Sequence, residues 1–208
     1  MTLDIIFLLL VLVVMIFLLL TEKLPVELTA FLGLVVLIVS GYLGPEEAFK
    51  GFGSSAVITM LSMFIVSGGL FHTGLADLIG SRIHALVGSR EVPLIIAIML
   101  LAGGLSTFMN NIAAATVLMP AVASMARHGR LPASRLFMPL SFGAILGGTI
   151  TSVGTPPNIL TVSILEERGF EPFKLFDFAP IGAVFLLLGV CYMVIVGRRY
   201  LPYRQLPK

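Results

Sequence analysis

Two stretches of this sequence place polar side chains inside long uncharged segments. Residues 92–126 contain no Asp, Glu, Lys or Arg, and the amide pair Asn110 and Asn111 lies near their centre. Residues 136–165 are equally free of these charges and contain Gly-Thr-Pro-Pro-Asn at 154–158. Two consecutive prolines cannot continue a helix, because each lacks an N–H group and clashes with the preceding turn. A helix break in each segment is therefore expected.

Such breaks predict two kinds of ion chemistry. Free carbonyl groups and amide oxygens suit a hard cation such as sodium, whereas the helix that begins after a break directs N–H groups at an anion. The alternatives are a buried amide pair that only joins helices, for Asn110 and Asn111, and a proline kink used in packing, for 154–158. We favour the ligand interpretation, because the breaks would otherwise leave too many polar groups unpaired.

The composition places these segments in a lipid bilayer. The 208 residues are 58% hydrophobic and 12% charged, with a mean hydropathy of +1.07. The apolar blocks are continuous rather than alternating, which excludes a membrane barrel. The predicted fold class is all-α, a polytopic membrane helical bundle. Conventional spans are expected at residues 5–20, 26–43, 54–71 and 178–196.

The two uncharged segments need a different explanation. Residues 92–126 are nearly twice as long as one span, which requires about 20 residues. We predict a re-entrant hairpin with Asn110 and Asn111 at its tip, and a broken helix over 136–165.

The chain is expected to have three parts. Residues 1–78 would form scaffold spans, and residues 93–208 a transport-type region with the hairpin, the broken helix and the last span. Between them, 79–92 is predicted to be an interfacial helix, because its apolar residues share one face. These residues are Ile79, Ile83, Leu86 and Val87.

The charged residues and the single cysteine narrow the functional classes. A net charge of +2 gives no reason to expect a nucleic-acid partner, and Cys191 alone cannot form a disulfide within the chain. Basic residues are expected on the cytoplasmic side except Lys50, Arg168 and Lys174, in a multi-pass protein of the cell inner (plasma) membrane. Residues 1–4 are too short and contain no Lys or Arg for the basic leading region of a secretory signal, so the first block is expected to remain as a span.

Three motifs, at 106–111, 139–149 and 154–158, resemble the divalent anion:sodium symporter family of the ion transporter superfamily. They read Ser-Thr-Phe-Met-Asn-Asn, Pro-Leu-Ser-Phe-Gly-Ala-Ile-Leu-Gly-Gly-Thr and Gly-Thr-Pro-Pro-Asn. The resemblance implies an elevator-type carrier in which the hairpin tip and the loop of the broken helix form a sodium site, with the anion beside the tip. Members contain two inverted halves, and this chain shows each motif once. It therefore resembles one half of an inverted-repeat transporter.

The resemblance also implies site residues. The sodium ligands would come from Ser106, Asn110, Asn111, Gly154 and Asn158. Asn111 and Asn158 would hold the ion jointly through their amide oxygens, with the Gly154 carbonyl. The anion would contact Asn111, Ile112, Thr155 and Pro156.

The hairpin tip departs from the family's Ser-Asn-Thr. Asn110 replaces the serine and Ile112 replaces the threonine, so one hydroxyl near a substrate carboxylate is missing. The Asn-Asn tip is more similar to a bacterial branch that includes suspected sulfate carriers.

The predicted function is one half of a secondary active transporter, with sodium-coupled symport of a small anion such as sulfate or a dicarboxylate. Its partners would be the lipid bilayer, the anion and a second half or another copy of the chain. The alternatives are a sodium/proton antiporter or metalloid-anion exporter of the same superfamily, or a non-transporting membrane subunit. An antiporter needs a titratable carboxylate in the membrane, and neither uncharged segment offers one.

An enzyme is not expected, and no catalytic residue is assigned. An intramembrane hydrolase needs paired aspartates, a Ser/His pair or a metal cluster at membrane depth. His72, His84 and His128 instead lie near predicted span ends or in basic loops.

Overall fold

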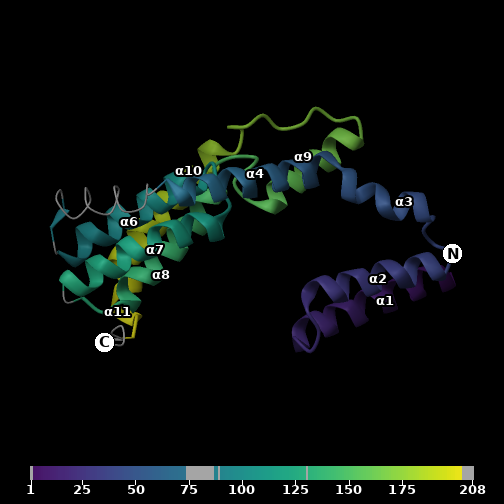
Figure 1. Cartoon of the computed structure of the whole chain (residues 1–208), viewed down its shortest axis with the longest axis horizontal. Helices are drawn as coiled ribbons and strands as arrows, with labels where there is room; N and C mark the ends of the chain where they lie inside the picture. Colours follow the sequence, from purple (N-terminus) through teal and green to yellow (C-terminus); the bar gives the residue numbers. More distant parts are fainter. Residues whose placement is uncertain (1, 74–86, 89, 130, 203–208) are drawn as a thin grey trace. The chain divides into compact units, whose positions relative to one another are not determined.

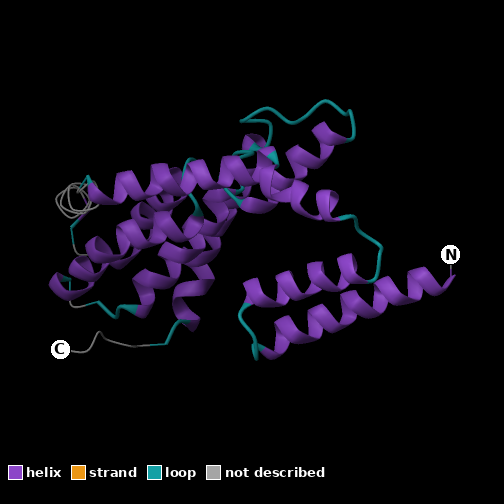
Figure 2. Cartoon of the chain, turned by 45° about the vertical axis from the view of Figure 1, so that its right-hand side comes forward, coloured by secondary structure: helices purple, strands orange, loops and turns teal. Residues whose placement is uncertain are grey.

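The computed structural model describes residues 2–73, 87–88, 90–129 and 131–202. These residues form helices and loops without a strand (Figures 1 and 2). The chain divides into two compact units, Met1–Ser54 and Ser55–Lys208. The predicted interfacial helix over 79–92 lies mostly outside the described residues.

The first unit is built on a helical hairpin. Helices α1 (Thr2–Thr21) and α2 (Val26–Val39) run side by side, joined by a short turn before Pro25 (Figure 1). Gly33 of α2 lies against the side chain of Met15, so the two helices approach closely. The sequence predicted a span to residue 43, but α2 ends at Val39. Gly41 has a φ of 79°, which a continuing helix does not allow.

Two further features follow α2. The hydroxyl of Tyr42 donates a 2.7 Å hydrogen bond to Asp4, and this bond raises the pKa of Tyr42 above its usual value. The next residues form helix α3 (Pro45–Lys50) and a 3₁₀ turn (Gly51–Gly53). Pro45 at the first helical position and two acidic residues in the first turn favour a helix start there.

The second unit contains the two predicted breaks. Its helices are α4 (Ser55–His72), α6 (Glu91–Ser106), α7 (Asn111–His128), α8 (Ser134–Gly148), α9 (Pro156–Glu167) and α10 (Ala179–Tyr192). Helix α10 continues through a π turn (Met193–Gly197) into α11 (Arg198–Tyr200). The predicted breaks are present: 107–110 separates α6 from α7, and 149–155 separates α8 from α9.

The chain turns back at the first break. Arg135 in the first turn of α8 forms a 3.1 Å salt bridge with Glu91 in the first turn of α6. Because α8 starts only a few residues after α7 ends, the end of α7 lies at the same end of the bundle as the start of α6. Helices α6 and α7 therefore form a hairpin with 107–110 at its tip.

Helices α6 and α8 run parallel in a fixed register. The pairs Glu91–Arg135 and Met99–Gly143 are both separated by 44 positions, and both pairs are in contact. A methyl group added at Gly143 would lie 2.7 Å from the Cα of Met99, and one added at Gly147 would overlap the α6 backbone. Small residues allow this backbone contact, as in other membrane helix pairs.

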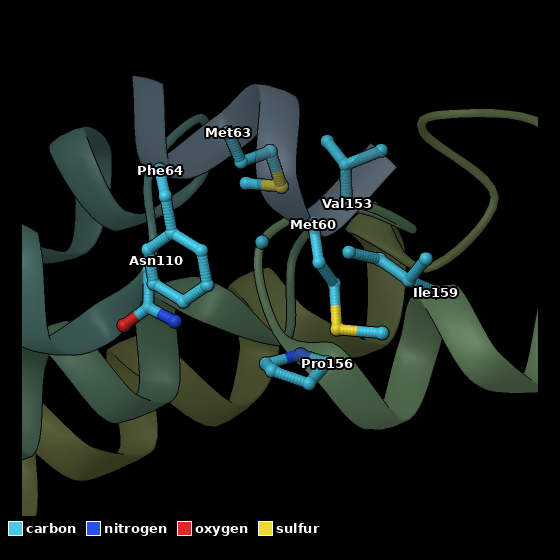
Figure 3. A pocket seen from close by; sticks show the side chains of 8 residues that line it. Met60, Met63, Phe64, Asn110, Val153, Pro156 and Ile159 are labelled. Carbon is cyan, nitrogen blue, oxygen red and sulfur yellow. The ribbon is translucent and has the colours of Figure 1, made fainter. Parts of the chain in front are cut away.

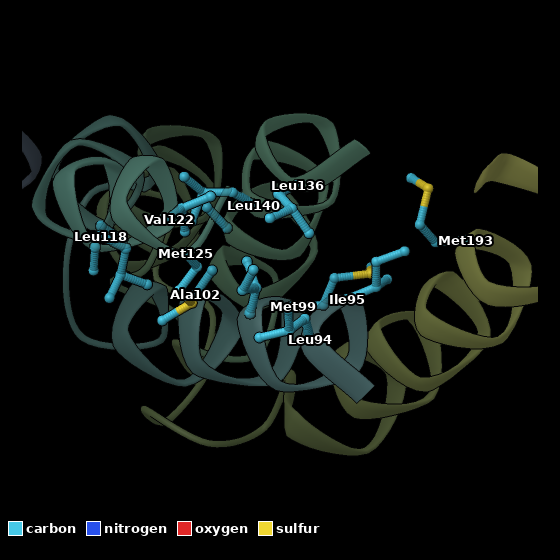
Figure 4. Packing of buried hydrophobic residues seen from close by; sticks show 14 of the residues in the cluster. Leu94, Ile95, Met99, Ala102, Leu118, Val122, Met125, Leu136, Leu140 and Met193 are labelled. Carbon is cyan, nitrogen blue, oxygen red and sulfur yellow. The ribbon is translucent and has the colours of Figure 1, made fainter. Parts of the chain in front are cut away.

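The apolar core lies among α6, α7, α8 and the end of α10. Leu94, Met99, Leu118, Leu136 and Leu140 are among its fully buried members (Figure 4). Helix α4 packs against α7 and α9, and Ser55 of α4 lies 3.2 Å from Ser163 of α9, oxygen to oxygen. The two breaks thus lie between this core and α4.

Three segments of the described chain are long and apolar enough to cross a membrane: Leu3–Thr21, Pro45–Gly69 and Ala179–Tyr200. Large apolar side chains are exposed along them, among them Leu10, Phe17, Ile65, Leu187 and Ile195. Exposure of that extent is costly in water and favourable in lipid. The prediction of an all-helical membrane bundle is confirmed.

Candidate functional site

The two helix breaks meet, and oxygen atoms collect where they meet. A methyl group added at Gly154 would lie 2.6 Å from the Gly148 carbonyl oxygen and 2.9 Å from the Ser106 carbonyl oxygen. One added at Gly148 would lie 3.2 Å from the Gly154 carbonyl oxygen and would overlap Oδ1 of Asn111. We call these four oxygens, from Ser106, Asn111, Gly148 and Gly154, the oxygen cluster.

Two oxygens of the oxygen cluster are carbonyl oxygens at the ends of helices. Ser106 and Gly148 are the last residues of α6 and α8, where carbonyl groups have no partner within the helix and carry partial negative charge. The neighbouring carbonyls of Leu105 and Gly147 accept backbone N–H groups. Within the described chain, no hydrogen bond ends on the carbonyl of Ser106 or Gly148. Both carbonyls can therefore bind a cation.

Asn111 contributes its side-chain oxygen. The Ser106 hydroxyl donates a 2.7 Å hydrogen bond to Oδ1 of Asn111, which fixes the amide at the start of α7. An amide oxygen with two lone pairs can accept this bond and still coordinate an ion. The described residues contain no group of three His, Cys, Asp or Glu side chains, so the oxygen cluster is built from neutral groups. Neutral carbonyl and amide oxygens suit a hard cation such as sodium.

The other two predicted sodium ligands, Asn110 and Asn158, form hydrogen bonds within the break segments. Oδ1 of Asn110 accepts the N–H of Ile112 at 2.8 Å, which caps α7. Nδ2 of Asn158 donates to the Thr151 carbonyl at 2.9 Å. Both side chains thus help to hold the two breaks in shape, and the bond made by Asn158 uses its amide nitrogen and leaves Oδ1, the predicted sodium ligand, without a hydrogen bond within the described residues.

The residues predicted for the anion lie at the starts of α7 and α9. Ile112 is 76% exposed, Pro156 is exposed and Thr155 is partly buried. The first two residues of α9 are prolines, which have no N–H, and the N–H of Asn158 donates to the Thr155 carbonyl. Helix α9 therefore offers the positive end of its dipole but few N–H donors to an anion.

A pocket adjoins both breaks on the side of α4. Asn110, Gly154 and Pro156 line it from the breaks, together with Met60, Met63, Phe64, Val153 and Ile159 (Figure 3). Asn110 is its polar side chain. Because Oδ1 caps the helix, Nδ2 is the end of the amide that can donate to a ligand.

Comparison with known proteins agrees with this arrangement. The family model of the citrate transporters (CitMHS) matches residues 16–208. The chain belongs to the citrate transporter family. The resemblance to divalent anion:sodium symporters is confirmed, and the family points to a transporter rather than an enzyme.

Curated relatives of this citrate transporter family member include three of different origin. It is 34% identical to an uncharacterized transporter, YfbS, of Escherichia coli, over 93% of the chain and 32% of the relative. It is 31% identical to a probable sodium/sulfate cotransporter 3 of Chlamydomonas reinhardtii, over 84% and 19%. It is 25% identical to the sodium-dependent dicarboxylate transporter SdcS of Staphylococcus aureus, over 89% and 38%.

These comparisons confirm the predicted membrane location and show how much of its relatives' length the chain covers. It is a multi-pass inner-membrane protein of a transporter family. The chain spans 32% of the length of YfbS and 30% of the length of an uncharacterized transporter of Synechocystis.

Two residues at the helix breaks of this citrate transporter family member were not assigned from the sequence. Gly148 contributes a carbonyl, and Thr151 links the breaks through its hydroxyl. A signal was present: the pattern Gly-Gly-x-x-Thr occurs at 103–107 and again at 147–151. The spacing of this repeat is that of the α6–α8 register.

Proposed function

We propose that this chain is part of a sodium-coupled secondary transporter and holds a sodium ion between its two helix breaks. The observation that carries the proposal is the oxygen cluster, in which two helix-terminal carbonyls, a loop carbonyl and an amide oxygen meet without a charged group. Broken helices supply such oxygens in secondary transporters. The names of the relatives, sodium/sulfate and sodium-dependent dicarboxylate transporters, support the same ion.

The ligand set follows the sequence-based prediction in part. Ser106, Asn111 and Gly154 supply oxygens, and the Gly148 carbonyl joins them. Asn110 and Asn158 act by shaping the breaks, through the hydrogen bonds that they make to Ile112 and Thr151.

The anion is proposed to bind beside the sodium, in the pocket under α4. Asn110 would donate from Nδ2 and Thr155 from its hydroxyl, while the starts of α7 and α9 contribute positive dipole ends. Asn111, Ile112 and Pro156 would form the surrounding wall. A small tetrahedral or carboxylate anion, such as sulfate or a dicarboxylate, suits these few donors together with a neighbouring cation.

The complete carrier is proposed to need more than this chain. The chain covers 32% of YfbS, so a second half or another copy of this chain would complete the transport path. In that assembly residues 1–78 would be scaffold spans and residues 93–208 the transport-type region. The apolar exposed faces of α1 and α10 would contact lipid or that second half.

The proposal can be tested by sodium-specific stabilisation. The full chain in detergent, with its second half where one is co-encoded, is heated in sodium chloride or in potassium chloride of equal ionic strength. We expect a higher unfolding temperature in sodium for the parent, because a ligand that binds only the folded state stabilises it. We expect this shift to be reduced in Asn111→Ala.

The control for this test is Thr116→Ala. Thr116 lies on α7 five positions after Asn111, is exposed, and its hydroxyl bonds only to the backbone of its own helix. Equal unfolding temperatures in sodium and potassium for the parent would exclude the sodium site. Uptake of labelled sulfate or succinate into proteoliposomes under a sodium gradient then separates the two anion classes.

A further inference from the structure

Thr151 connects the two helix breaks. It lies in the loop between α8 and α9 and is completely buried, at 0% exposure. Its hydroxyl donates to the carbonyl of Thr107 at 2.5 Å and accepts the N–H of Gly154 at 3.1 Å. Its own carbonyl accepts Nδ2 of Asn158 at 2.9 Å. One residue is thus bonded to the first break, to its own loop and to the first turn of α9.

These partners are direct neighbours of the oxygen cluster. Thr107 follows Ser106, so a hydrogen bond to the Thr107 carbonyl constrains the peptide group next to the one that carries the Ser106 carbonyl. Gly154 is held through its N–H, which constrains the carbonyl at its other end. Within the described residues, the bond from Thr151 to Thr107 is the one hydrogen bond that joins 107–111 to 149–158. Between the break segments themselves, the Ser106 and Gly154 oxygens are therefore held at their separation by the hydrogen bond of a single hydroxyl.

We propose that Thr151 is a positioning residue that sets the spacing of the oxygen cluster and, through it, the preference for sodium over potassium. This inference rests on the proposed sodium site. A cation site discriminates by the size and rigidity of its oxygen cage, because a larger ion fits only where the ligands can move apart. The Thr151 hydroxyl ties the Ser106 side of the cage to the Gly154 side and prevents that movement. Asn158 supports this arrangement by donating a hydrogen bond to the Thr151 carbonyl.

The matched pair of variants is Thr151→Val and Thr151→Ser. Valine keeps the shape of threonine but removes the hydroxyl, whereas serine keeps the hydroxyl and loses a methyl group. A control variant is Thr161→Val: Thr161 lies on α9, is exposed, and its hydroxyl bonds to the backbone of its own helix. A threonine that only fills space would show its effect in the serine variant rather than in the valine variant.

The first measurement is thermal stability in detergent as a function of sodium, and separately of potassium. In Thr151→Val we expect the sodium concentration for half-maximal stabilisation to rise by about tenfold or more. The potassium concentration for half-maximal stabilisation, divided by that for sodium, should fall, which means a weaker preference for sodium. Thr151→Ser and Thr161→Val should stay within about twofold of the parent. Unchanged sodium dependence and selectivity in Thr151→Val would overturn the inference.

The second measurement does not depend on sodium. Hydrogen exchange in sodium-free buffer should be faster in Thr151→Val than in Thr151→Ser at the Gly154 amide, because the bond that protects it is lost. It should also be faster through 107–111, because this segment loses the bond from its Thr107 carbonyl to the second break and opens more often. If the parent shows no sodium-specific stabilisation, the proposed function fails, and exchange alone then decides whether Thr151 joins the breaks. Equal exchange in the valine and serine variants would show that it does not.

Discussion

Gly148→Ala separates a role in the ion site from a role in packing. The added methyl group would overlap Oδ1 of Asn111 and would lie 3.2 Å from the Gly154 carbonyl oxygen. The overlapped atom is the end of a side chain, so Asn111 can rotate away and the fold should persist. That rotation removes the amide oxygen from the oxygen cluster and breaks its 2.7 Å hydrogen bond with Ser106.

The magnitude follows from the lost ligand. Removing one partner from a buried polar site costs about 1–3 kcal/mol, which corresponds to a roughly five- to 150-fold rise in the sodium needed for half-saturation. The assay is the sodium-dependent shift in unfolding temperature, measured against potassium at equal ionic strength. In potassium, Gly148→Ala should lose only the contribution of the Ser106–Asn111 hydrogen bond, about 0.5–1.5 kcal/mol, and the sodium shift is measured from that baseline.

Gly104→Ala is the matched control. Gly104 holds the position on α6 that Gly148 holds on α8 in the parallel register, but a methyl group there meets no atom within 4 Å. Alanine is favoured over glycine within a helix by about 0.5–1 kcal/mol, so this variant should be slightly more stable, with an unchanged sodium shift. Parent-like sodium dependence in Gly148→Ala, or an equal loss in Gly104→Ala, would refute the reasoning.

Two further outcomes are expected. In Gly147→Ala the methyl group meets the α6 backbone, which cannot rotate away, so thermal unfolding should show a loss of about 1–3 kcal/mol of stability in either salt. The control is Gly68→Ala, whose methyl group lies in open space on α4 and should cause no such loss. Equal stability of the two variants would contradict the close packing of α6 and α8. The charge distribution predicts that Lys174 lies outside and Arg198 in the cytoplasm. In a Cys191→Ala background, an impermeant thiol reagent added to intact cells should label a cysteine at 174 and leave one at 198 unlabelled, and the reverse pattern would invert the topology.

The breaks were predictable because their causes are local. Consecutive prolines end a helix wherever they occur, and an amide pair in a segment too long for one span favours a turn. The structure accordingly starts α9 at Pro156 and α7 at Asn111. The end of α2 was missed because apolar content continues to Leu43, whereas the conformation of Gly41 ends the helix earlier.

The rest of the site depends on contacts between distant residues. The Gly148 carbonyl is available because α8 ends there, and Gly148 lies against Asn111 because α6 and α8 touch through glycine backbones. Neither condition is visible in the residues around 148. Thr151 is a small polar residue whose sequence neighbours give no sign of its bond to Thr107, 44 positions earlier. Only the repeated Gly-Gly-x-x-Thr indicated that the two segments correspond.

The register of α6 and α8 has a consequence for insertions and deletions. The contacts that hold Glu91 to Arg135 and Thr107 to Thr151 are set within the helices, and the loop between α7 and α8 only connects them. One residue inserted near position 132 would therefore change the spacing but leave each contact in place. One residue inserted between Gly143 and Gly147 would instead rotate everything after it by about 100° about the helix axis. Thr151 would then face away from Thr107. Insertions and deletions should therefore be tolerated in the loop between α7 and α8 but disrupt the site when they fall within α6 or α8.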